Sequence, residues 1–223
     1  MSRMQNPIPK PWRIMLDRER NCTTMYFQEN SIFPSGRGVD FMVRGAVCWP
    51  ATVGNGVDTA TEGFVIVAGQ ELESKRVVVF EQRPFVCVDH ILAPDRMIQY
   101  EGITHRMTVW HSRYYVDTYY WHDHLDTHNR YLIQMLRSEM LNPKPWFAEV
   151  IWHDDNQAKH AIWEMVTHNR LVHWAGEAPE HGRMQPLYDA LLRFRDKEEI
   201  LPATKAMMTL AIGLERFPWR AET

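Results

Sequence analysis

The sequence predicts an α+β fold, with an antiparallel sheet from the N-terminal half packed against helices from the C-terminal half. Runs rich in β-branched residues crowd residues 39–91, whereas helical periodicity dominates the chain after about residue 114. The two kinds of segment do not alternate as they would in a doubly wound α/β fold. Because 45% of the 223 residues are hydrophobic, we expect one sizeable core and a single domain over residues 1–223.

The first segment, residues 1–13, is expected to be an extended proline-rich arm. Pro7, Pro9 and Pro11 fix φ and remove backbone donors, so this segment cannot supply a central strand or a helix interior. An ordered arm of this kind must lie on its own core or on a partner.

Strand patterns follow the arm. The predicted strands are residues 39–43, 64–68, 76–80 and 85–88. The short polar segment 70–75 favours an antiparallel hairpin, and the glycine-rich stretch 52–63 is expected to be a longer loop. Pro84 should interrupt the last strand or place it at an edge.

Helical patterns follow the strands. The predicted helices run from about residue 114 to 140, 155 to 170, 186 to 197 and 202 to 216. Pro143 and Pro145 end the first of them, and the apolar run 146–152 predicts one more strand before Asp154 or Asp155 caps the next helix.

The stretch between Trp110 and Arg130 is dense in potential metal ligands. His124 and His128 are four residues apart, and Asp117 lies two helical turns before His124, so a helix would place all three on one side. Imidazole and carboxylate groups are ligands for Zn, Mn or Fe. The alternative interpretation is a wet polar face of an amphipathic helix.

A second candidate metal cluster falls in the predicted helix after Asp155. His160, Glu164 and His168 are spaced by four, which would align two imidazoles and a carboxylate over two turns. The simpler alternative is a surface on which His and Arg side chains pair with nearby carboxylates.

Two resemblances to known families bear on this chemistry. Residues 122–128, HDHLDTH, resemble the HxHxDH signature of metallo-β-lactamase-fold hydrolases, although Thr127 separates the aspartate from the last histidine. Three antiparallel runs followed by a helix resemble the nuclease fold of ribonuclease H, which implies an aspartate in its first strand. Residues 64–68 contain none, so Glu81 and Asp89 would act with Asp117 or Asp154.

Several other classes find no support in the sequence. No GxSxG, Walker or complete dinucleotide fingerprint occurs. The three cysteines never form CxxC, which is typical of buried thiols in a reducing compartment, and we therefore expect a cytoplasmic protein. Neither a secretory signal nor a run of 18 apolar residues is present, so membrane insertion is not expected.

The leading hypothesis at this point is a non-catalytic interaction or assembly subunit with a protein partner or a second copy of itself, and with no cofactor. It depends on the nine tryptophans, because aromatic residues concentrate at interface centres. One alternative is a metal-dependent hydrolase, such as a phosphoesterase or nuclease, using Zn, Mn or Fe. Another is single-stranded nucleic-acid binding, in which Trp110, Arg113, Tyr114, Tyr115, Tyr119 and Tyr120 stack on bases. Since the net charge is −3, any nucleic-acid role would depend on a local basic patch.

Overall fold

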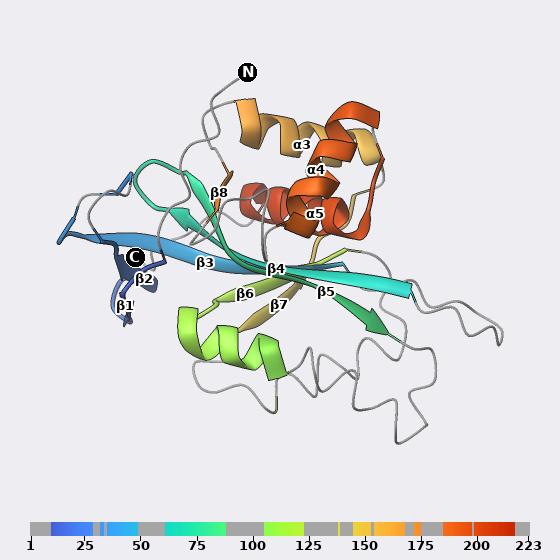
Figure 1. Ribbon diagram of the computed structural model, residues 1–223. Coiled ribbons are helices and arrows are strands. Elements are labelled where there is room, and N and C mark those ends of the chain that lie inside the picture. Colours follow the sequence, from blue (N-terminus) through green and yellow to red (C-terminus); the bar gives the residue numbers. More distant parts are fainter. Residues whose placement is uncertain are drawn as a thin grey trace.

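The chain folds around one mixed sheet with helices on both faces (Figure 1). The computed structural model describes residues 10–28, 32–33, 35–48, 61–87, 105–122, 138, 145–152, 154–167, 172–174, 185–197 and 199–216. Helices α3 (Asp155–Thr167), α4 (Gln185–Lys197) and α5 (Pro202–Arg216) cover one face. A helix of residues 105–114 covers the other face.

The strands vary from long central ones to short peripheral ones. They are β1 (Arg13–Asp17), β2 (Cys22–Tyr26), β3 (Gly38–Cys48), β4 (Thr61–Glu71), β5 (Val77–Cys87), β6 (Thr118–Trp121), β7 (Trp146–Glu149) and β8 (Val172–Trp174). Strands β1 to β5 are antiparallel neighbours in chain order. Strand β6 joins β3 in parallel, β7 joins β6 in parallel, and β8 runs parallel to β5.

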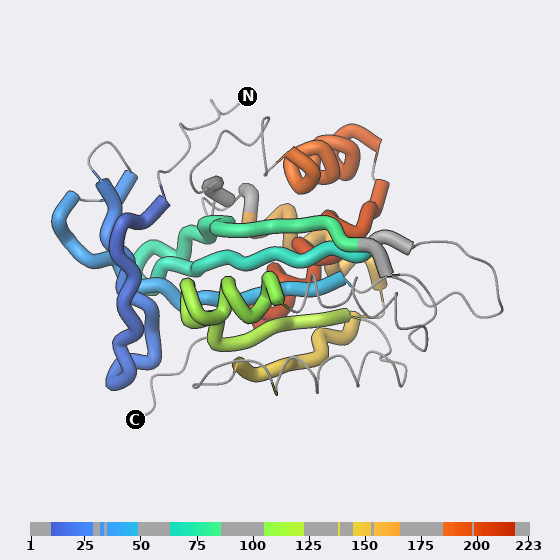
Figure 2. Tube along the Cα trace, turned by 60° about the horizontal axis from the view of Figure 1, so that its bottom comes forward, coloured from blue at the N-terminus to red at the C-terminus, as the bar shows by residue number. Residues whose placement is uncertain are grey.

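The length of β3 lets two strands share one of its edges. Strand β2 pairs with the first part, up to Phe41, and β6 pairs with Arg44 to Val47. The hairpin of β1 and β2 therefore crosses one end of the sheet, drawn in blue in Figure 2. Its turn is closed by Asp17, whose Oδ1 accepts hydrogen bonds from the backbone N of Glu19 at 3.1 Å and of Arg20 at 3.0 Å.

Two apolar clusters bury the two faces of the sheet. Alternate side chains of β3 point in opposite directions. Met42 and Ala46 pack with residues of α3, α4 and α5, whereas Phe41 and Val43 pack with the helix of residues 105–114. Helix α5 lies close to β6 because Gly213 leaves room for the ring of Tyr120, which a Cβ at this position would meet.

The α+β class predicted from the sequence is confirmed, with the antiparallel strands in the N-terminal half and the three labelled helices in the C-terminal half. The hairpin at 70–75 is also confirmed, since β4 and β5 pair around a turn in which Lys75 has φ 60°. The two runs 76–80 and 85–88 belong to one strand, β5, which continues through Pro84. Residues 1–9 of the predicted arm lie outside the described residues, and Trp12 N donates to Tyr26 O at 3.0 Å.

The prediction of one long helix from about residue 114 is wrong at its start. The helix of residues 105–114 ends there, and residues 118–121 form strand β6. All four side chains of β6 are buried, because the strand lies inside the sheet with an apolar cluster on each face. Of the helices in the described segments, none has the length and apolar character needed to span a lipid bilayer.

Candidate functional site

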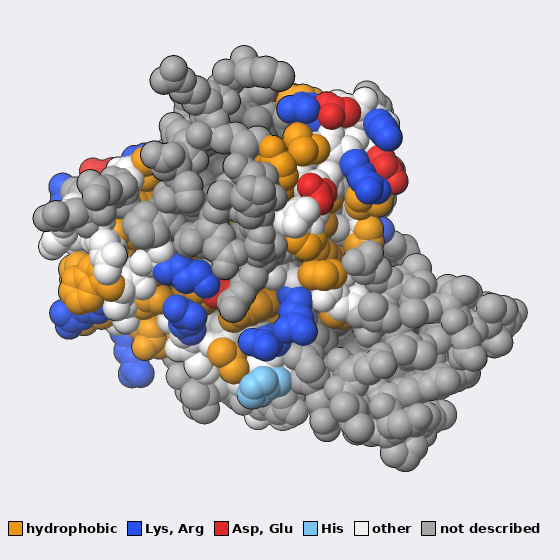
Figure 3. Space-filling model, in the orientation of Figure 1, with side chains coloured by type: hydrophobic (Ala, Val, Ile, Leu, Met, Phe, Trp, Pro, Cys, Tyr) orange, Lys and Arg blue, Asp and Glu red, His pale blue; other side chains and the backbone are white. Residues whose placement is uncertain are grey.

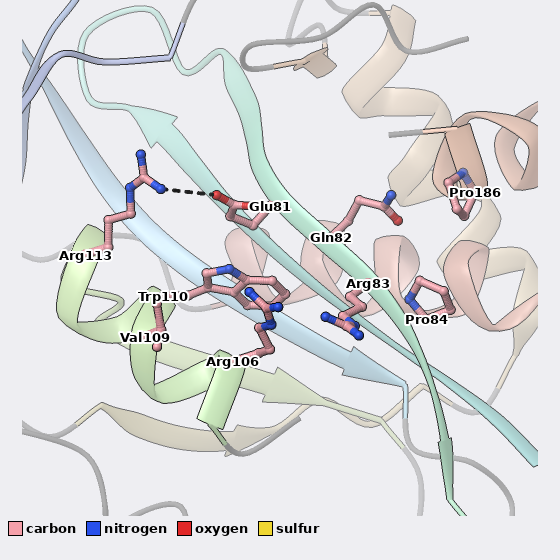
Figure 4. A pocket seen from close by; sticks show the side chains of 9 residues that line it. All are labelled: Glu81, Gln82, Arg83, Pro84, Arg106, Val109, Trp110, Arg113 and Pro186. Carbon is pink, nitrogen blue, oxygen red and sulfur yellow. Dashed lines mark ion pairs between the residues drawn. The ribbon is translucent and has the colours of Figure 1, made fainter. Parts of the chain in front are cut away.

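A groove of about 450 Å³ runs along the outer edge of β5 (Figure 4). Strand β5, the helix of residues 105–114 and the first turn of α4 form its walls. Its lining residues are Glu81, Gln82, Arg83, Pro84, Arg106, Val109, Trp110, Arg113 and Pro186. We call it the arginine groove.

The groove exists because β5 extends beyond β8, the strand that pairs with its outer edge. Strand β8 pairs with β5 only from Val77 to Val79, so the described part of the sheet leaves the following residues with β4 as their one partner. Pro84 suits this edge because it has no N–H to donate outward. A register shift opposite Val67 and Ala68 turns the strand at the start of the groove.

Alternation along β5 distributes the polar side chains between the two faces. Glu81 and Arg83 lie opposite Val67 and Val65, whose side chains face the helix of residues 105–114. Gln82 lies opposite Ile66, on the face of the three C-terminal helices. Figure 4 shows Gln82 extending toward Pro186, whereas Arg83 lies beside Arg106.

Glu81 is buried, and its carboxylate is engaged through Oε1. Tyr114 Oη donates to Glu81 Oε1 at 2.8 Å, and the same oxygen lies 3.5 Å from Lys10 Nζ and 4.0 Å from Arg113. Burial, and then the Glu81 charge, raise the pKa of Tyr114, so this phenol stays a donor at all ordinary pH values. Glu81 thus ties the helix of residues 105–114 to the sheet.

The arginines give the groove an excess of positive charge. Arg83 and Arg106 are exposed, and neither has an ion-pair partner in the described part of the molecule. Arg113 is 48% exposed and only approaches Glu81, which Lys10 also neutralises. Figure 3 shows Lys and Arg side chains gathered on this side of the molecule. Guanidinium groups bind phosphate oxygens through paired N–H donors, so the groove favours a phosphate-bearing ligand.

Gln82 is the unusual member of the lining. Its exposed fraction is only 7%, yet within the described structure neither Nε2 nor Oε1 has a hydrogen-bond partner. Buried amides without partners are rare because each unmade hydrogen bond costs free energy. The groove therefore presents one unsatisfied donor and one unsatisfied acceptor beside its positive charges.

The aromatic residues predicted to stack on bases are mostly part of the core. Trp110 is 6% exposed, and Tyr114, Tyr119 and Tyr120 are 0% exposed. Their rings pack in the two apolar clusters, and the fully buried tyrosines offer no stacking face to a ligand. Arg113 and the largely buried Trp110 are the members of that set that line the groove.

The first predicted metal cluster is only partly described. Asp117 precedes β6 and forms an ion pair with Arg44 of β3, whose side chain is 8% exposed. Burial lowers the pKa of the Arg44 guanidinium, so the Asp117 carboxylate provides charge compensation that this site needs. His124 and His128 lie outside the described residues. Asp117 is separated from both by strand β6, so they do not share one helix face as predicted.

The second predicted cluster is an exposed pair on α3. His160 Nε2 lies 3.7 Å from Glu164 Oε1, with side chains 75% and 38% exposed, and His168 lies outside the described residues. No group of three or more His, Cys, Asp or Glu residues suited to a metal ion occurs among the described residues. The metal ligands therefore stay a prediction.

His122 lies at a different part of the sheet. It follows β6 directly, at the carboxyl end of the parallel strands, where open sheets tend to bind ligands. Its Nδ1 lies 2.8 Å from Val150 O, and its ring stacks on Trp152. This contact orients the imidazole by a backbone carbonyl, as is typical of histidines with a fixed tautomer.

Three antiparallel strands followed by a helix are present, but the first of these strands is β3. Strands β3, β4 and β5 are antiparallel and lead to the helix of residues 105–114. The aspartate of β3, Asp40, accepts a hydrogen bond from Thr24 Oγ1 at 2.8 Å and pairs with Arg20. Glu81 is engaged in the groove, and Asp89 lies outside the described residues.

No protein-family profile matches the sequence, and no curated protein matches it. Among solved structures, the human cytomegalovirus terminase nuclease domain is similar at 13% identity, covering 78% of this chain and 83% of that one, with a TM-score of 0.48. The fowlpox virus Holliday junction resolvase is similar at 8% identity, covering 78% and 99%, with a TM-score of 0.40. RuvC of T. thermophilus, in complex with a Holliday junction substrate, shows 14% identity, covers 78% and 91%, and has a TM-score of 0.37.

The prediction of a non-catalytic interaction or assembly subunit is wrong. The similar structures are a nuclease domain, a resolvase and RuvC. The hypothesis depended on the number of tryptophans, and that number does not distinguish core from surface. Trp110, Trp121 and Trp152 are 6–8% exposed and belong to the core, whereas Trp12, Trp146 and Trp163 are 45–72% exposed.

Sequence reasoning missed the arginine groove. Arg83 and Arg106 belong to different elements, and nothing in their spacing predicts that they meet. One signal was available in residues 81–83, where Glu, Gln and Arg interrupt an otherwise apolar run from Val77 to Cys87. Three polar residues in succession must place at least one polar side chain on each face of a strand.

Proposed function

We propose that this protein acts on nucleic acid and that the arginine groove binds the sugar-phosphate backbone. The observation that carries the proposal is the excess charge of Arg83, Arg106 and Arg113 around a concave edge of the sheet. Because the chain has a net charge of −3, nucleic-acid binding requires a local basic patch, and these cations form one. The exposed guanidinium groups of Arg83 and Arg106 are available for phosphate oxygens.

The proposed reaction class is metal-dependent hydrolysis of phosphodiester bonds. Its support is an analogy of fold, since three antiparallel strands lead to a helix and β6 and β7 extend the sheet in parallel, beside β3. A divalent ion would supply an activated water and neutralise phosphate charge. The described residues do not assemble three ligands for such an ion.

Binding is tested by fluorescence anisotropy with a labelled mixed-sequence oligonucleotide at several salt concentrations. Three phosphate contacts predict a slope of log K against log salt of about −2 for a single strand. Arg106→Ala should weaken binding and make that slope shallower by about 0.7. Arg193, which is exposed on α4 and does not line the groove, provides the control variant Arg193→Ala. Equal affinities for wild type and Arg106→Ala would contradict the proposal.

Hydrolysis is tested separately on single-stranded and duplex DNA with Mg²⁺, Mn²⁺ or Zn²⁺, and with a chelator as the control. We expect metal-dependent cleavage that Arg106→Ala reduces and Arg193→Ala does not. Binding without cleavage under any of these ions would refute the hydrolase half of the proposal. The proposal that the groove binds the nucleic-acid backbone would then be judged by the anisotropy data alone.

A further inference from the structure

We infer that the arginine groove takes single-stranded nucleic acid and that Gln82 hydrogen-bonds the edge of an unpaired base. This inference rests on the proposed function and adds to it the kind of strand that is bound. It starts from Gln82, whose amide is 7% exposed, lines the groove, and is unpartnered within the described structure.

The chemistry of the amide suits a base better than a phosphate. A primary amide offers a donor next to an acceptor, whereas a phosphate offers acceptors only. Base edges carry donors beside acceptors, so a base can satisfy both Nε2 and Oε1 of Gln82. The arginines therefore bind the phosphates of the ligand, and the amide of Gln82 binds one of its bases.

The position of Gln82 excludes a base that remains paired. The edge of β5 is flanked by the helix of residues 105–114 on one side and by Pro186 of α4 on the other (Figure 4). Since this edge is recessed between two walls, it cannot enter the major groove of a duplex as a protruding helix or β-ribbon does. An unstacked base, by contrast, can leave its strand and enter a protein pocket.

The size of the groove agrees with this kind of ligand. Its volume of about 450 Å³ falls in the range of pockets that enclose small molecules, which is suited to one or two nucleotides. The exposed fraction of Val109 is 41%, so an apolar side chain borders the groove beside the charges. A base entering toward Gln82 would cover part of this apolar surface.

The experiment compares three ligands at one salt concentration: a single strand, a blunt duplex of the same sequence, and a strand of the same length made of abasic sites. Wild type should bind the single strand about tenfold more tightly than either of the other two. Gln82→Met should bind all three within about threefold of one another. Gln70→Met, on a half-buried amide of β4 outside the groove, should keep the wild-type preference.

The outcomes separate this inference from the proposed function. If wild type binds duplex or abasic strand as tightly as the single strand, or if Gln82→Met keeps the preference, the inference is overturned, whereas loss of affinity in Arg106→Ala still supports backbone binding. If Arg106→Ala binds all three ligands as wild type does, the proposed function fails and this inference fails with it. Thermal unfolding of Gln82→Met checks that the variant is folded.

Discussion

Replacing Gln82 with methionine should make the protein more stable. The two side chains have similar length and volume, so the packing around residue 82 is retained, while two buried polar atoms without partners are removed. The desolvation cost of an unsatisfied buried polar group is about 1–3 kcal/mol, so we expect the free energy of unfolding to rise by an amount in that range. For a chain of this length that corresponds to an increase in Tm of about 2–4 °C per kcal/mol.

Thermal and urea unfolding, followed by circular dichroism without ligand, measure this change. Gln70→Met is the matched control, because Gln70 is only half-buried in β4 and its amide reaches water; its effect should stay within about 0.5 kcal/mol. A lower Tm for Gln82→Met would refute the reasoning, since it would mean that the amide makes hydrogen bonds on which the fold depends. An unchanged Tm would show that Gln82 costs nothing in the free protein, which would likewise contradict the argument.

Three further predictions follow from the core. Asp117→Asn should lower the free energy of unfolding by about 2–3 kcal/mol because it leaves the buried Arg44 without charge compensation. Because Asp117 pairs with Arg44, its contribution to the stability of the wild type should be the same with and without a chelator. Burial raises the pKa of Tyr119, so above about pH 10 the unfolded chain loses a proton that the folded protein retains, and stability falls as pH rises. Tyr119→Phe should reduce that loss by about 1 kcal/mol between pH 10 and 11 in urea unfolding, because the full slope of about 1.4 kcal/mol per pH unit is reached only above this range. Gly45→Ala should destabilise by about 1–3 kcal/mol in the same assay, because the added Cβ meets the ring of Tyr119; an effect below about 0.5 kcal/mol would contradict this contact.

Periodicity predicted the C-terminal helices and the short strand β7, and it failed for residues 114–121. The three helices have the expected boundaries to within a few residues, whereas strands β3 and β4 extend beyond the predicted runs 39–43 and 64–68. Strand β6 has only four residues, all buried, and such a run shows no alternation that would distinguish it from a helix. Strands β1 and β2 were also missed, because their position depends on pairing with the first part of β3.

Strand β6 removes the helical spacing on which the first predicted ligand set was based. Asp117 was placed with His124 and His128 by helical spacing, but a strand follows Asp117 directly. A strand advances about 3.3 Å per residue, so it separates residues that a helix would bring to one side. What remains of the first cluster in the described structure is Asp117 as the partner of Arg44.

The groove escaped sequence reasoning because its parts converge only in three dimensions. Arg83 comes from the edge of β5 and Arg106 from a helix more than twenty residues later. Their proximity depends on Glu81 and Tyr114, whose hydrogen bond joins the two elements. Neither the burial of Gln82 nor the open edge of β5 can be read from the residue types alone.

The contrast between Glu81 and Gln82 argues that the unsatisfied amide is a property of the groove and not of loose packing. The two residues are adjacent on β5, both are buried at 7% exposure, and both line the same groove. Glu81 has three partners, from the N-terminal segment and from the helix of residues 105–114. Packing in this region therefore gives a buried charge several partners, while it leaves the neutral neighbour without one in the described structure. Since departures from full hydrogen bonding concentrate where proteins bind ligands, Gln82 is the position in the groove at which a ligand is expected.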